Sequence, residues 1–163
     1  MKATIYNRLN GDTVASPAVA LRSGEQTLEA LLPGGYHDTD HLPTSKLTWD
    51  ILPDIVTVDA FGVPEMFAVG VWGASVPDGA EYGEERHTLE IWIYEPDGNV
   101  GLDKSANRIK RVMHRWKPTN NEDLKSIMEI KFFNESREFI DPDLGDLNGR
   151  IIRFTVRTLD KNS

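Results

Sequence analysis

The first residues that could do chemistry lie in the segment His37-Asp38-Thr39-Asp40-His41, which combines two imidazoles with two carboxylates. Zinc and related divalent metals accept these ligands. Two histidines four positions apart come close enough to share a metal in a helix, where they lie one turn apart on the same face. This segment follows Pro33-Gly34-Gly35 and precedes Leu42-Pro43, which disfavour a helix. The sequence therefore predicts no metal site here.

A second acidic group, Asp141, Asp143 and Asp146 around Gly145, resembles a calcium loop only in part. The glycine is not at the position that such a loop requires, and no glutamate closes the ligand set. Motifs for a serine nucleophile, a phosphate-binding loop, a dinucleotide or a zinc protease are missing from the sequence. The chain contains no cysteine, which excludes a thiol nucleophile. We expect no catalytic residue, no metal and no cofactor.

The most informative segment is 102–116, in which apolar residues recur in steps of four, three, four and three. These residues are Leu102, Ala106, Ile109, Met113 and Trp116. The spacing predicts an amphipathic helix that buries this stripe.

The opposite face of the predicted helix is almost entirely basic. It carries Lys104, Arg108, Lys110, Arg111 and Arg115. Like charges four residues apart cost a few tenths of a kcal/mol per pair, and the chain has a net charge of −8. We predict that these cations meet a negative surface, at a subunit interface or in the lumen of a ring. Reversing Arg108 and Arg111 to glutamate should then weaken self-association and leave the fold intact.

The chain itself offers acidic partners in two predicted loops. The candidate interface acids are Asp78, Glu81, Glu84, Glu85, Asp141, Asp143 and Asp146. A phosphate backbone is an alternative partner for the basic face, and a solvated face is another.

The surrounding elements predict one α+β domain over residues 1–163. We expect short N-terminal helices at 1–10 and 17–32, and long loops at 36–54 and 75–86. Strands are predicted at 55–60, 66–73, 87–94, 127–133 and 150–158, because apolar and polar residues alternate there. They should form a single mostly antiparallel sheet, with the long helix 102–116 packed on one face.

The N-terminal sequence MKATIYNRLNGD has one Lys and no apolar core, which disfavours a signal peptide. Apolar stretches such as 67–72 are too short to cross a bilayer. We therefore expect no membrane partner.

Several segments match a known arrangement in their order and spacing. They are LEALLPGGY at 28–36, IVTV at 55–58, the strand–turn–helix unit at 86–116, NESR at 134–137 and RIIRFTVR at 150–157. Together they resemble the tail terminator, or tail completion, proteins of long-tailed bacteriophages.

This resemblance implies a homo-oligomeric ring, a hexamer, that caps the tail tube. Its partners would be the tail-tube protein and the head-side connector protein, with DNA passing through the lumen without specific binding. The protein would belong to the virion, at the junction of head and tail, after assembly in the host cytoplasm. A ring needs two different complementary patches on each subunit, and the basic helix and acidic loops would supply them. Another connector or tail-tube protein, a small enzyme and a DNA-binding module remain alternatives.

Overall fold

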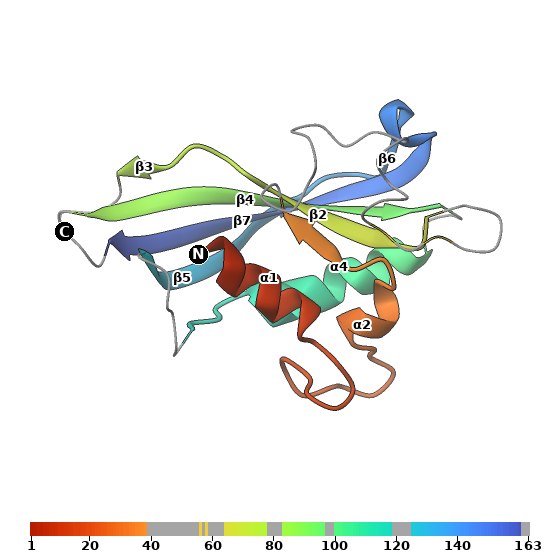
Figure 1. The fold of residues 1–163 in the computed structure, drawn as a ribbon, viewed down its shortest axis with the longest axis horizontal. Helices are drawn as coiled ribbons and strands as arrows, with labels where there is room; N and C mark the ends of the chain where they lie inside the picture. Colours follow the sequence, from red (N-terminus) through yellow and green to blue (C-terminus); the bar gives the residue numbers. More distant parts are fainter. Residues whose placement is uncertain are drawn as a thin grey trace.

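The computed structural model describes residues 1–38, 56, 58, 64–77, 83–96, 100–118 and 125–160. The chain has an α+β fold with few helices and a mixed, curled sheet (Figure 1). The elements follow one another as α1 (Lys2–Asn10), α2 (Leu28–Leu31), β1 (Tyr36–Asp38), β2 (Phe67–Trp72), β3 (Val76–Pro77), β4 (Glu84–Glu95), α4 (Val100–Met113), β5 (Lys125–Glu135), β6 (Phe139–Asp141), the 3₁₀ turn η2 (Pro142–Leu144) and β7 (Leu147–Asp160).

The strands of the sheet are ordered β1-β2-β4-β7-β5, with β3 paired to β4 and β6 paired to β7. The longest ladder joins β4 and β7, from Glu84 opposite Leu159 to Glu95 opposite Asn148. Within the part of the chain that the structure describes, the strand pairs are antiparallel except β1 and β2, which run parallel. The expectation of a mostly antiparallel sheet is thus corrected to a mixed sheet.

The parallel pair is set by the Pro33-Gly34-Gly35 turn. Gly34 N donates to Met66 O at 2.9 Å, and Ala68 N donates to Gly35 O at 3.0 Å. These bonds align β1 with the start of β2. The ring of Tyr36 then crosses Gly70, where a Cβ atom would collide with the tyrosine hydroxyl. A glycine at position 70 is therefore needed for this close approach.

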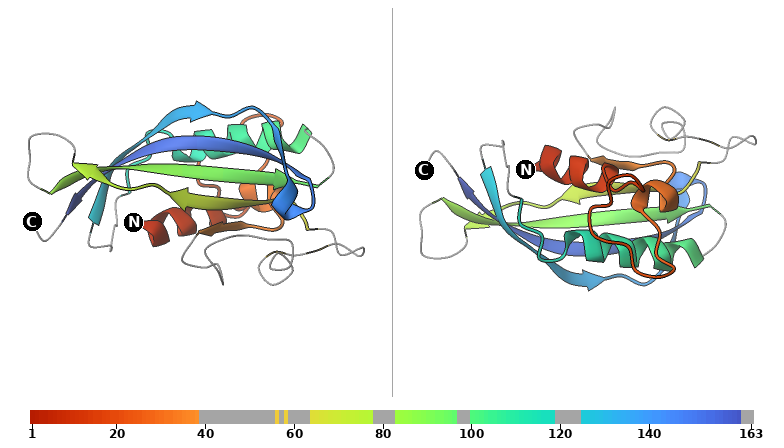
Figure 2. Two further views of the ribbon diagram at one scale, coloured as in Figure 1. Left: turned by 90° about the horizontal axis from the view of Figure 1, so that it is seen from above. Right: turned by 90° about the horizontal axis from the view of Figure 1, so that it is seen from below.

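The described helices α1, α2 and α4 lie on the same side of the sheet, below it in Figure 1 and in front of it in the right panel of Figure 2. Their apolar residues share one buried cluster with the strands, including Ile5, Leu28, Ile109, Ile91 and Phe154. In α4 the buried apolar side chains are Leu102, Ala106, Ile109, Val112 and Met113, each at most 1% exposed. Trp116 follows the end of the helix and is only partly buried.

Among the described residues, a second and smaller apolar cluster lies at one end of the other face of the sheet. This cluster contains Phe67, Val69, Tyr94, Leu144 and Leu147, and η2 contributes Leu144. Farther along this face, Arg153 pairs with Glu90 at 2.7 Å and Arg157 pairs with Glu129 at 3.2 Å. Cross-strand ion pairs of this kind suit a surface that faces solvent.

The segment predicted as a helix over 17–32 is helical only at Leu28–Leu31. The cause is the carboxylate of Asp12, which accepts hydrogen bonds from Ala18 N and Leu28 N, both at 2.8 Å. These bonds wrap the backbone around one side chain, and Leu21 is left 41% exposed. Residues 11–27, which form this irregular segment, are called the strap below.

The predicted loops also differ from the structure. The loop 36–54 begins with β1, and its residues after 38 lie outside the described residues. The loop 75–86 contains β3 and the first residues of β4, with 78–82 outside the described residues. Of the strand predicted at 55–60, only Val56 and Val58 are described, and Val58 forms an isolated bridge with Pro64.

The outer edge of β5 is covered by the turn that follows α4. Arg115 N donates to Ile130 O at 2.7 Å, and Phe132 N donates to His114 Nδ1 at 2.9 Å. Arg115 adopts a left-handed backbone conformation with φ of 61° to make this contact. Satisfying the free groups of an edge strand blocks unwanted pairing with another chain. The turn also explains why the helix ends at Met113 rather than at Trp116.

Candidate functional site

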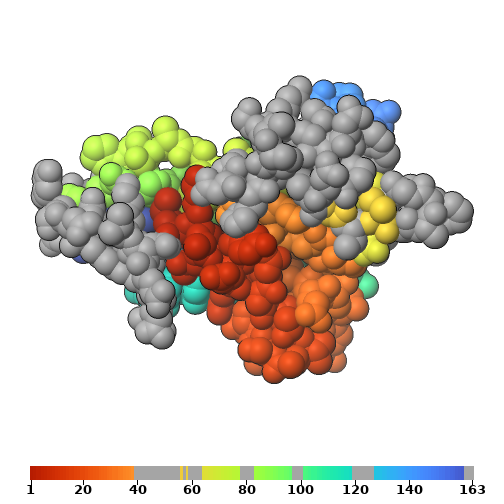
Figure 3. Space-filling model, in the orientation of Figure 1, coloured from red at the N-terminus to blue at the C-terminus, as the bar shows by residue number. Residues whose placement is uncertain are grey.

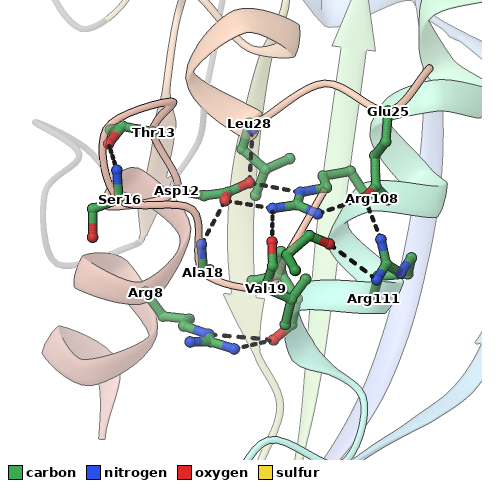
Figure 4. Close-up of polar contacts among 12 residues, drawn as sticks. Arg8, Asp12, Thr13, Ser16, Ala18, Val19, Glu25, Leu28, Arg108 and Arg111 are labelled. Carbon is green, nitrogen blue, oxygen red and sulfur yellow. Dashed lines mark hydrogen bonds and ion pairs between the residues drawn. The ribbon is translucent and has the colours of Figure 1, made fainter. Parts of the chain in front are cut away.

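Arg108, predicted to lie at an interface or in a lumen, is buried with 1% of its surface exposed. Its Nε and Nη2 donate to the two carboxylate oxygens of Asp12, at 2.8 Å and 2.7 Å (Figure 4). Two parallel bonds of this kind form the strongest geometry of an arginine–carboxylate pair. The prediction for Arg108 is wrong, because the strap of the same chain supplies its negative partner.

The strap also holds the next arginine of the basic face. Glu25 accepts from Arg108 Nη1 at 2.9 Å and makes a short ion pair with Arg111 Nη1. The backbone carbonyl of Val19 accepts from Arg108 Nη2 at 3.0 Å. Figure 4 shows the side chains of Asp12 and Glu25 on either side of the Arg108 guanidinium. Two strap acids therefore relieve the repulsion between the two arginines.

Protonation of these groups reflects their pairing. Burial alone would raise the pKa of Asp12, but hydrogen bonds from Arg108, Ala18 N and Leu28 N outweigh it and lower that pKa. Burial alone would also raise the pKa of Glu25. The hydrogen bond from Arg111 favours the charged carboxylate, and the pKa of Glu25 is lowered. The pKa of Arg108 is raised, chiefly by its hydrogen bonds to Asp12. All three groups are held in their charged forms.

A cavity of about 500 Å³ lies between the strap and α4. Its lining contains five cations and one carboxylate: Arg22, Lys104, Arg108, Lys110, Arg111 and Glu25. Arg22 and Lys104 are exposed at its rim, and Lys110 pairs with Glu135 at 2.8 Å. In the space-filling view the strap forms the lower part of the molecule, on the helix side (Figure 3). The cavity is a local positive surface on a protein of net charge −8.

Arg115 does not line this cavity. Its side chain is exposed and its backbone holds the edge of β5. The predicted basic face is thus divided among a buried arginine, a cavity with Lys104, Lys110 and Arg111, and an exposed residue beyond the helix.

The acids predicted for loop 75–86 are placed differently from the expectation. Asp78 and Glu81 lie outside the described residues. Glu84 and Glu85 belong to β4, where Glu84 lies 4.0 Å from Arg157 and Glu85 lies 3.4 Å from the His87 ring. Their assignment to an acidic loop is therefore wrong, because the antiparallel ladder with β7 extends through both positions.

The acids at 141–146 form a compact turn, called the acidic turn below. Asp141 accepts from Asp143 N and from the Tyr94 hydroxyl, both at 3.0 Å. Burial, assisted by Asp141, raises the pKa of that tyrosine. Leu144 is buried, whereas Asp143 and Asp146 are exposed. The turn is therefore fixed at its base and presents two carboxylates to solvent.

The metal candidate at 37–41 is only partly described. His37 Nε2 lies 2.8 Å from Gly34 O, and Asp38 is buried with 1% exposure. Asp40 and His41 lie outside the described residues. Within the described part of the chain, no group of three or more His, Asp or Glu side chains is arranged to hold a metal ion. The expectation of no metal stays a prediction.

Sequence reasoning missed Asp12 and Glu25 as partners of the basic face. In the sequence, Asp12 stands in Asn10-Gly11-Asp12 after the predicted helix 1–10, where residues of these types indicate only a helix end. No periodic pattern could connect it to Arg108, since 96 positions separate the two residues.

No protein-family model matches the chain, and no curated protein matches it. None of the described helices has the length and apolar character needed to cross a bilayer. The arrangement offers two oppositely charged surfaces: the cavity on the helix side of the sheet and the acidic turn on the other side (Figure 1).

Proposed function

We propose that the chain is a structural subunit of the tail terminator kind, which forms a ring, a hexamer, on the end of a phage tail tube. In this role the ring joins the tail-tube protein to the head-side connector protein. The proposal is carried by one observation, the placement of a positive cavity and an acidic turn on opposite sides of the sheet.

A ring of identical subunits needs a heterologous contact, in which two different patches of each copy meet two neighbours. Patches of opposite charge on opposite sides suit this requirement. A patch that pairs with itself would instead produce a closed dimer.

The proposal also includes the finer fold, with α4 as the long helix that covers one face of the sheet. In its support, Ile109 and Met113 belong to the same buried cluster as Ile91 and Phe154. A helix fixed in this way would hold Lys104 and Lys110 in constant positions for a neighbouring copy.

The overall acidity of the chain supports a passage that does not retain DNA. A net charge of −8 repels a phosphate backbone. If a neighbouring copy covers the cavity cations, they are not available to bind phosphates in the lumen.

The test is the assembly state of the purified protein, measured by sedimentation velocity and negative-stain electron microscopy. We expect closed rings of one size with a central opening, and binding of these rings to one end of purified tail tubes. Long tubes of stacked rings would identify a tail-tube protein instead. A protein that stays monomeric at all concentrations would overturn the proposal.

A further inference from the structure

We propose that the acidic turn of one copy docks into the positive cavity of the next copy. This inference rests on the proposed function and names the two surfaces that would join neighbouring subunits. The occupant is a second copy of this chain, and the argument for it is charge complementarity between two surfaces that each copy carries.

The cavity is suited to receive carboxylates. Arg22 and Lys104 are exposed at its rim, and Arg111 is about one quarter exposed, with 27% of its side chain accessible. Its base is held by the Asp12–Arg108 pair, whose side chains are both fully buried. Because this base is fixed before a partner arrives, docking would order few additional groups, and preorganisation of this kind favours affinity.

The acidic turn is preorganised as well. Asp141 caps its first turn, Leu144 anchors it in the smaller apolar cluster, and Gly145 has the left-handed φ of 65° that closes it. Asp143 and Asp146 are exposed on this fixed base. They are carboxylates that an arginine fork or a lysine ammonium would recognise.

The two surfaces cannot meet within one molecule. The strap and α4 lie below the sheet in Figure 1, and η2 lies above it; both panels of Figure 2 agree. The contact must therefore form between copies, and it repeats in one direction, as a ring or a filament requires.

Two charge-reversed variants test the pairing. The first, Arg22→Glu with Lys104→Glu, makes the cavity rim acidic. The second, Asp143→Lys with Asp146→Lys, makes the turn basic. A control, Lys117→Glu with Arg137→Glu, changes the net charge as the first variant does, at exposed positions outside the cavity lining. Circular dichroism and thermal unfolding establish that each variant is folded.

The self-association constant of each variant alone should fall by at least about tenfold at roughly 0.05 M salt, where charges are least screened. An equimolar mixture of the two should recover association, since each basic surface then finds an acidic one on the other variant. The control should assemble like the unchanged protein.

Rings that form unchanged in both folded variants would overturn this docking but leave the proposed function standing. A mixture that stays dissociated would also overturn it. The unchanged protein could instead bind duplex DNA, and Arg22→Glu with Lys104→Glu could abolish this binding without altering assembly. That result would identify the cavity as a phosphate-binding site and overturn the docking. If the unchanged protein never assembles, the proposed function fails together with this inference.

Discussion

At the scale of single residues, the buried guanidinium of Arg108 requires partners for its N–H groups. Asp12, Glu25 and the Val19 carbonyl accept from it. Removing one partner of a buried ion pair leaves an uncompensated charge, which costs far more than the intact pair contributes. The pair therefore specifies how the strap lies on α4 more than it adds to stability.

Asp12→Asn should destabilise the fold by about 3–5 kcal/mol at neutral pH. The amide keeps the size of the side chain but leaves Arg108 without its buried anion. Urea unfolding of the two proteins measures the difference. The exposed Asp146→Asn is the matched control and should change stability by less than about 0.5 kcal/mol; equal effects of the two substitutions would contradict the role given to Asp12.

Low pH should remove the contribution that the Asp12–Arg108 pair makes to folding stability. The pKa of Asp12 and that of Glu25 are lowered in the folded protein. Their stabilisation is therefore present above the unfolded pKa, near 4, and is lost as the pH falls through the folded pKa. Urea unfolding between about pH 7 and pH 2 should show the gap between the unchanged protein and Asp12→Asn narrowing below about pH 4. A gap that stays constant with pH would show that Asp12 does not titrate as the folded pair requires.

The burial of Arg108 also changes an expectation drawn from the sequence. Reversing Arg108 and Arg111 together would place a glutamate beside Asp12 in the core, so the variant would unfold rather than report on assembly. The spacing of the basic residues predicted a negative surface on a partner. It could not indicate that the strap, distant in sequence, provides the negative charge.

At the scale of elements, α4 depends on its apolar stripe. Met113 is fully buried, so Met113→Asp should destabilise by more than about 4 kcal/mol, because it buries an unpaired charge. Thermal unfolding followed by circular dichroism is the measurement. Asn107→Asp, an exposed substitution on the same helix, should shift stability by about 0.5 kcal/mol or less. A mild effect at Met113 would mean that this end of the helix is not packed.

The turn after α4 stores backbone strain. A left-handed conformation costs a residue with a side chain about 1–2 kcal/mol. Glycine avoids this cost, but its greater conformational entropy in the unfolded state cancels part of the gain in stability. Arg115→Gly should therefore stabilise the protein by up to about 1 kcal/mol in denaturant unfolding. Arg137→Gly removes the same charge at an exposed position where the backbone φ is not positive and should destabilise slightly. A loss of stability in Arg115→Gly would show that the side chain itself holds the turn.

Strong periodicity predicted the long strands β4, β5 and β7 and the helix α4. The strand expected at 87–94 lies within β4, and those at 127–133 and 150–158 lie within β5 and β7. The buried residues of α4 include four of the five in the predicted stripe. The predicted helix 17–32 failed because a side-chain carboxylate captured its backbone N–H groups. Helix propensity and hydrophobic periodicity give no information about a distant side chain that accepts these hydrogen bonds.

The candidate site was less predictable than the elements. Lys104, Lys110 and Arg111 line one cavity as members of one helix face would. That cavity exists only because the strap crosses α4, which no local pattern specifies. The parallel pairing of β1 with β2 likewise depends on bonds between Gly34-Gly35 and residues 66–68.

At the scale of the whole molecule, the positive cavity and the acidic turn lie on opposite sides of the sheet. Contacts between exposed opposite charges weaken as salt shortens the Debye length from about 10 Å at 0.1 M to about 3 Å at 1 M. Self-association of the unchanged protein should therefore decrease across this range in sedimentation velocity. Assembly that strengthens with salt would point to an apolar interface instead.

The order of strands in the sheet has a consequence for the time course of folding. β7 follows β4 and β5 in the sequence but lies between them in the sheet, so these two strands have no neighbour on that side until β7 emerges from the ribosome. Asp12 and Arg108 are separated by 96 positions, which is about 5–20 s of translation. The sheet therefore cannot close before Leu147–Asp160 is synthesised, and until then β4 and β5 each lack the neighbour that joins them.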